Sequence, residues 1–254
     1  LLLSNAHCHK ALKQEKLLFL TLRSVVDIAI TPQFKVQMLS IYTQELMNYG
    51  YYNETLEQAI NILSLDASVN TANTRLVLCK LALEQGRYSL VDEYLPLLLK
   101  LNEFYPQAMQ LNCQLALKQL DKEKAVNLLT QFMANIKLSK PEYSGFIVHG
   151  LLRLNEYALA RTLLSSLPPK FHTEPWYKVL DSLCLLEGGE VKTALAPIEN
   201  ISIEDLPDWF QPKELIWNTK ARLYEKLKDY AHSFDYFEKT ANALEQQQNK
   251  YRKV

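Results

Sequence analysis

Six short turns recur along this chain of 254 residues at a nearly constant distance, and they constrain its fold more than any other feature. The turns begin at Gly50, Gly86, Leu120, Asn155, Gly189 and Lys228. Successive first residues are 36, 34, 35, 34 and 39 positions apart. Recurrence at about 34 residues is typical of helix-turn-helix arrays, in which no unit can bury its apolar face alone. We therefore predict an all-α chain, a right-handed superhelical solenoid of about six helix-turn-helix repeats with a leading helix.

The turns divide the chain into a leading segment and an array. Residues 1–35 are expected to form a leading or capping helix, continuous over about 5–31, which is either a cap or the remnant of a further repeat. The array is predicted over 36–254, with units near 36–70, 72–105, 106–140, 141–173, 174–202 and 214–247. Prolines are tolerated in the first turn of a helix and disrupt its interior. Pro106, Pro141 and Pro175 accordingly mark the openings of three predicted first helices.

Composition sets limits on partners and location. Apolar residues make up 48% of the chain, and the 28 basic residues balance the 28 acidic ones, so no basic footprint for nucleic acid is present. No apolar run approaches the roughly 20 residues that span a bilayer. We expect a cytoplasmic protein, and we interpret the chain as a piece of a longer one. The opening Leu1–Ala6 leaves one alternative open, the tail of an export segment with a small-x-small cleavage site.

The sequence offers little basis for catalysis. Its five histidines, at 7, 9, 149, 172 and 232, are scattered, and it contains no Gly-x-Ser-x-Gly, His-Glu-x-x-His or Cys-x-x-Cys motif. Cys79 and Cys113 are 34 positions apart and occupy the same repeat position, where a small buried residue is expected. The cluster at 7–9, His-Cys-His, lacks further identifiable ligands for a metal. We predict a noncatalytic segment without metal or cofactor.

The last unit carries the pattern Trp217-x3-Ala221-x2-Tyr224, followed by Asp229-Tyr230, Phe234 and Phe237. In these residues the chain resembles the tetratricopeptide repeat family, over about 36–244. The chain departs from the family pattern at Arg75 and Asn112, where large apolar residues are expected, and no proline closes the first unit. The resemblance implies a concave face that is lined by the first helix of each repeat and binds another protein or a peptide.

Uncharged amides dominate the predicted concave face in the first three units. Asn and Gln carry both a donor and an acceptor, so they can pair with a peptide backbone. Simple solvated helix surface is the alternative, and the two readings stay open, as does self-association through exposed cap helices. The predicted partner-binding residues are Gln37, Gln44, Asn48, Asn73, Lys80, Gln107, Gln110, Gln114, His149, Arg153, Asn218 and Arg222. Gly145, in the same row, is expected to mark a place where something packs closely, because glycine costs about 1 kcal/mol in a helix interior.

Two further expectations concern specific ligands. The family members that hold the acidic C-terminus of heat-shock chaperones use Lys and Asn at places where this chain has Ser40, Ile41 and Gln44, so we predict against that ligand. Residues 228–244 resemble the last repeat before the catalytic domain of bacterial repeat-containing sulfotransferases. That resemblance implies an alternative function, the noncatalytic N-terminal array of such an enzyme.

The long connection 203–213 carries two aromatic residues, Trp209 and Phe210. Aromatic side chains in a connection either dock on a partner or pack back onto the neighbouring helices. We favour the second interpretation.

Overall fold

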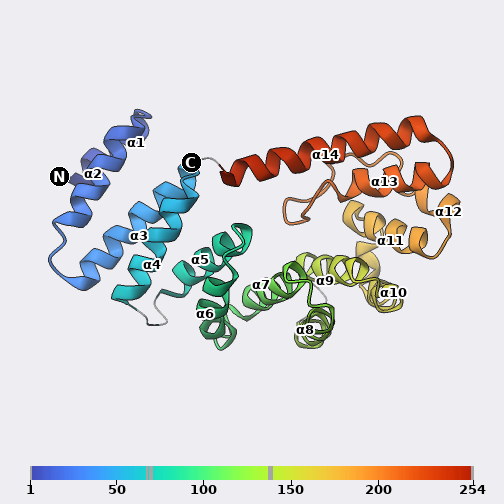
Figure 1. Cartoon of the computed structure of the whole chain (residues 1–254), viewed down its shortest axis with the longest axis horizontal. Helices are drawn as coiled ribbons and strands as arrows, with labels where there is room; N and C mark the ends of the chain where they lie inside the picture. Colours follow the sequence, from blue (N-terminus) through green and yellow to red (C-terminus); the bar gives the residue numbers. More distant parts are fainter. Residues whose placement is uncertain (1, 67, 69–70, 137–139, 253–254) are drawn as a thin grey trace. The chain divides into compact units, whose positions relative to one another are not determined.

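The computed structural model describes residues 2–66, 68, 71–136 and 140–252, and this part of the chain is helical with no strand (Figure 1). Successive helices are α1 (Leu2–Ala11), α2 (Glu15–Asp27), α3 (Pro32–Tyr49), α4 (Tyr52–Leu65), α5 (Ala72–Glu84), α6 (Tyr88–Leu99), α7 (Tyr105–Lys118) and α8 (Lys122–Asn135). They are followed by α9 (Pro141–Arg153), α10 (Tyr157–Ser166), the 3₁₀ turn η2 (Pro169–Phe171), α11 (Pro175–Glu187), α12 (Val191–Leu195), α13 (Leu215–Lys226) and α14 (Tyr230–Arg252). The all-α class is confirmed.

The six predicted turns share one backbone conformation. Gly50, Gly86 and Gly189 have φ of 83°, 72° and 82°, in the left-handed region that glycine adopts readily. Leu120, Asn155 and Lys228 take the same conformation with φ of 59°, 62° and 64°. At each turn the next amide donates back to a carbonyl five residues earlier, as in Tyr51 N to Leu46 O at 2.9 Å. This is the Schellman ending of a helix, so each turn closes one helix and reverses the chain into the next.

The leading segment differs from the prediction. Instead of one helix over 5–31, α1 and α2 form a hairpin whose turn lies at Lys13, with φ of 55°. Gln14 N donates to His9 O at 2.8 Å, which repeats the Schellman pattern of the other turns. The single-helix prediction is therefore wrong. The turn is hard to see in the sequence because no glycine marks it. Of the two readings, the further repeat describes this segment better than a single capping helix.

The chain folds as two compact units, each containing several of the helical repeats. We call them unit 1 (residues up to Leu111) and unit 2 (Asn112–Asn249), and from here on the word unit is used only for these two. The boundary falls inside α7. Within unit 1, α1 packs on α2, α3 on α4 and α5 on α6, and the hairpins join through α2–α3 and α4–α5 contacts. Within unit 2, α9 packs on α10 and α11 on α12, while the first helices α9, α11 and α13 pack in sequence. Helical hairpins stacked on their neighbours are the tetratricopeptide-like arrangement expected from the sequence.

The repeat pattern predicts the buried side of α8 and α10 correctly, whereas in α14 Phe237, at the position of Leu129 and Leu164, is exposed. Ala125, Leu129 and Phe132 of α8 are fully buried, and Ala160 and Leu164 of α10 are buried at the same repeat positions. Cys79 and Cys113 are also fully buried, and burial raises the pKa of each thiol to about 12. Small residues at these positions allow the paired helices to approach closely.

Prolines begin the helices where the sequence places them. Pro141 and Pro175 are the first residues of α9 and α11, and Pro106 lies in the first turn of α7. Two N-caps add side-chain acceptors for the free amides of a first turn: Thr31 Oγ1 accepts from Phe34 N at 3.3 Å, and Asp121 Oδ1 from Lys124 N at 3.0 Å.

Within the described part of the chain, none of the helices combines the length and the apolar character that crossing a membrane requires.

Candidate peptide-binding face

The predicted row on α3 is exposed. Gln37, Gln44 and Asn48 are all at the surface, at spacings that bring them to one side of the helix. Gln44 Nε2 donates to Asn48 Oδ1 at 3.0 Å, and Asn48 Nδ2 donates weakly to Glu45 Oε2 at 3.5 Å. Gln37 makes no side-chain hydrogen bond to any described residue. The row therefore presents polar groups that a ligand can reach.

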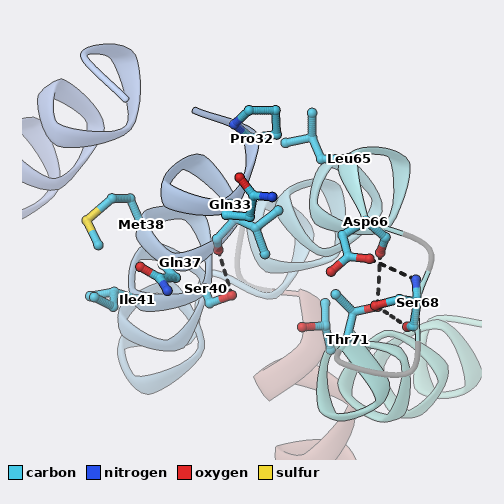
Figure 2. A pocket seen from close by; sticks show the side chains of 12 residues that line it. Pro32, Gln33, Gln37, Met38, Ser40, Ile41, Leu65, Asp66, Ser68 and Thr71 are labelled. Atoms are coloured by element: carbon cyan, nitrogen blue, oxygen red, sulfur yellow. Dashed lines mark hydrogen bonds between the residues drawn. The ribbon is translucent and has the colours of Figure 1, made fainter. Parts of the chain in front are cut away.

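A pocket of about 920 Å³ lies beside Gln37 (Figure 2). One wall comes from α3, and the other from the end of α4, the residues Asp66, Ser68 and Thr71 after it, and the start of α5. The lining includes Pro32, Gln33, Val36, Gln37, Ser40 and Ile41 on the α3 side, and Leu65, Asp66, Ser68, Thr71 and Thr74 on the other. Ile41 and Leu65 are exposed at 40% and 42%, so apolar surface adjoins the amides and hydroxyls.

Arg75 supports the second wall of the pocket from behind. Its side chain is buried in α5, at the place where the repeat pattern predicts a large apolar residue. Nη1 donates to Ser68 O at 2.9 Å and to Thr71 Oγ1 at 3.0 Å. Thr71 Oγ1 in turn donates to the carbonyls of Ser68 and Asp66, at 2.9 and 3.0 Å. The departure from the pattern thus holds Ser68 and Thr71 next to the pocket.

Asp66 supplies negative charge at the rim of the pocket. Its carboxylate accepts a hydrogen bond from Ser68 N at 2.9 Å. The hydrogen bonds from Ser68 lower the pKa of Asp66, and the positive charge of Arg75 lowers it further. The lining residues named above are amides, hydroxyls, aliphatic groups and this one carboxylate. Such a set binds by hydrogen bonding and apolar contact and contains no paired nucleophile and base.

In unit 2 the corresponding part of the predicted row is covered by the chain itself. A Cβ added to Gly145 would lie 3.0 Å from Trp209 Cζ3 and 3.5 Å from Trp176 Cε3. The indole of Trp209 packs edge-on against Trp176, with ring centroids 5.4 Å apart, and Phe210 beside it is buried. Both predictions are confirmed: the two aromatics pack back onto the helices, and Gly145 marks a close approach. The neighbour at Gly145 is a segment of the same chain.

The chain just before this covering connection is held by a buried lysine. The Lys220 ammonium of α13 is buried and donates to Glu199 O at 3.0 Å and to Ile201 O at 2.8 Å. Burial lowers the pKa of Lys220, and the charge of Lys239 lowers it as well. Closer to the aromatic pair, Lys213 Nζ donates to Asp208 Oδ1 at 2.9 Å. The chain is therefore tied to α13 just before the connection, and an ion pair within the connection spans Trp209.

The other predicted residues of unit 2 lie in mixed surroundings. His149 is half-buried; burial lowers its pKa to about 4, with a smaller contribution from the charge of Arg153, so it is neutral at pH 7. Arg153 itself is exposed. Arg222 is half-buried and forms an ion pair with Glu187 of α11, and Asn218 is half-buried. Arg222 thus already has an acidic partner within unit 2.

The remaining predicted residues divide between the two units. Asn73 and Lys80 are exposed on α5 of unit 1. Gln107, Gln110 and Gln114 are half-buried on α7, which crosses the unit boundary. The repeat pattern did not predict Asp66, Ser68 or Thr71 as site residues; the available signals were Arg75 at an apolar repeat position and the polar stretch after α4. Among the described residues, no group of three or more His, Cys, Asp or Glu side chains is placed to hold a metal ion.

Comparison with known proteins adds little. No protein-family model and no curated protein matches the chain. Among solved structures, a chain of the one described as "Structure of Naa15/Naa10 bound to HypK-THB" is similar, with 16% sequence identity and a TM-score of 0.40. The similarity covers 95% of this chain and 36% of that chain, so this chain spans about a third of its length. A likeness at this level carries no argument about function, and the sulfotransferase resemblance finds no support.

Proposed function

We propose that this helical array binds an extended peptide segment of another protein through the exposed α3 face of unit 1. The observation that carries the proposal is the pocket beside Gln37, whose side chain forms no hydrogen bond to a described residue and adjoins exposed aliphatic surface. An extended peptide offers backbone donors and acceptors for the amides and one apolar side chain for the cavity. The rest of the predicted row in unit 1, Gln44, Asn48, Asn73 and Lys80, extends this surface.

The proposal treats the chain as a noncatalytic binding module. The groups around the pocket recognise and orient a ligand, and the single carboxylate of Asp66 favours a peptide with a positive or neutral charge at that end. A cytoplasmic location is part of the proposal and rests on the sequence alone.

Selection of random peptides on the full chain, followed by affinity measurement for the best binder, tests this function. Ile41→Lys places a charge in the apolar part of the pocket and is expected to weaken binding about tenfold or more, as for a residue in direct contact with the peptide. Gln37→Glu is expected to weaken it less. Both residues are exposed, so folding stability is expected to change by no more than about 0.5 kcal/mol.

Leu159→Lys on α10 is the matched control. Leu159 is exposed at 41% and Ile41 at 40%, so both changes place a lysine at an equally exposed aliphatic position. The control is expected to leave peptide affinity unchanged. Equal affinity of the Ile41→Lys and Leu159→Lys proteins for the selected peptide would refute the proposed face.

A further inference from the structure

Helix α14 turns its large apolar side chains outward. Tyr230, Phe234, Phe237, Ala241 and Leu244 follow one another at spacings of 4, 3, 4 and 3 residues and are all exposed. The exposed fractions of Tyr230 and Phe234 are 66% and 67%. Alternating spacings of 3 and 4 bring residues onto one stripe of a helix, the pattern of a coiled-coil seam. We call these five residues the α14 seam.

The buried side of α14 is smaller and more polar than this seam. Ser233 and Thr240 are buried, and Tyr236 stacks on Tyr224 of α13 with ring centroids 5.9 Å apart. An ordinary surface helix has the opposite arrangement, with large apolar groups inside and polar ones outside. Single exposed apolar residues are common, whereas a continuous stripe of aromatic and aliphatic groups marks an interaction site.

One edge of the seam is acidic. Glu238 and Glu245 each follow a seam residue by one position, so they lie about 100° around the helix from Phe237 and Leu244, on the side away from Ser233 and Thr240. Both glutamates are exposed. The nearest lysine on α14, Lys239, is on another side, with its ammonium 4.9 Å from the centre of the Tyr236 ring. A helix lying on the seam would therefore face negative charge along this edge.

We infer that the α14 seam is a docking surface for an amphipathic helix of another protein, one with apolar residues at alternating spacings of 3 and 4 and Lys or Arg along its edge. Helix-in-groove binding uses this spacing, and charges beside a helical seam select the partner. A second copy of this chain fits less well. Two α14 helices paired antiparallel would bring the Glu238 and Glu245 edges together, and like charges at these positions disfavour pairing.

Two synthetic helical peptides of 21 residues provide the probe. Both carry Leu at the seam positions; one has Lys and the other Glu along the edge that would face Glu238 and Glu245. Binding to the full chain is measured by fluorescence anisotropy at low and at physiological salt. The Lys peptide is expected to bind about tenfold more tightly than the Glu peptide, with the difference shrinking as salt is added.

Variants of the full chain assign the binding to the seam. Phe234→Lys is expected to weaken the Lys peptide about tenfold or more, since an anchor residue at the centre of an interface is removed. Ile30→Lys, at another exposed apolar residue, is the control and is expected to have no effect. Glu238→Lys together with Glu245→Lys is expected to reverse the preference toward the Glu peptide.

Three outcomes overturn the inference. The first is that neither peptide binds. The second is equal affinity for both peptides, unchanged by the two glutamate substitutions. The third is a dimer of the unmodified chain in sedimentation that Phe234→Lys dissociates, because the occupant of the seam would then be a second copy. The Ile41→Lys protein is expected to bind the Lys peptide normally, which separates this surface from the face of unit 1.

Discussion

Helix α3 in unit 1 and helix α9 in unit 2, each predicted as the first helix of its repeat, present the predicted row in opposite states. On α3 of unit 1, Gln37 is exposed and has no hydrogen-bond partner among the described residues, beside a pocket of about 920 Å³. On α9 of unit 2, Trp209 packs at Gly145 and covers this position of the row. A repeat pattern therefore predicts on which side of a helix a residue lies. Whether that side is exposed to a ligand depends on the connections between repeats.

The covered face of unit 2 is expected to depend most strongly on Trp209. Trp209→Ala removes the aromatic contacts with Trp176 and Phe210 and is expected to lower the free energy of unfolding by about 3 kcal/mol. Urea denaturation measures this loss. Trp209→Phe keeps an aromatic ring at the site and is expected to lose less than half of the unfolding free energy that Trp209→Ala loses. A loss below about 0.5 kcal/mol for Trp209→Ala, the range of ordinary surface changes, would show that the connection is not held at this point.

On the open side of the comparison, Arg75 is expected to maintain the second wall of the pocket. Arg75→Met keeps an unbranched side chain but removes the hydrogen bonds to Ser68 O and Thr71 Oγ1, and is expected to cost about 2 kcal/mol of folding free energy. Affinity for the peptide selected on the full chain is expected to fall with it. Lys16→Met, at an exposed position of α2 outside the predicted row, serves as the control. If Arg75→Met left both stability and affinity unaltered, the wall would not depend on this side chain.

Substitution of Gly145 is expected to have the smallest effect on stability. It also tests most sharply whether Trp209 covers this position. Alanine is favoured over glycine by about 1 kcal/mol in a helix interior. In the unmodified chain the new Cβ would lie 3.0 Å from Trp209, so Gly145→Ala is expected to be neutral or destabilising. In the Trp209→Ala background the obstacle is absent, and the same change is expected to stabilise the protein by about 1 kcal/mol. Equal effects in both backgrounds would mean that Trp209 and Gly145 are not coupled.

Much of this fold follows from the sequence because the turns have a local cause. A Schellman ending needs a residue with positive φ, and three of the six predicted turns place glycine there, while the constant spacing identifies the other three. The turn at Lys13 lacks both signals, which explains why the first hairpin was predicted as one helix. Buried positions such as Ala125 and Cys113 follow from helical periodicity alone.

The candidate site is less accessible to sequence reasoning. The amide row on α3 can be read from spacing, but the pocket also needs Ser68 and Thr71, which the buried side chain of Arg75 holds. The covering of Gly145 depends on Trp209, which is 64 residues away along the chain. Contacts of this kind arise from tertiary packing and leave no periodic signal in the sequence.

The central claim, that unit 1 offers an open peptide-binding face while unit 2 covers its own, is tested most directly by photo-crosslinking. A peptide selected on the full chain would carry a benzophenone group, and mass spectrometry would identify the crosslinked residues. We expect crosslinks in the segments that line the pocket, 33–41 and 71–74. Crosslinks confined to 142–153 and to the neighbourhood of Trp209 would contradict the claim.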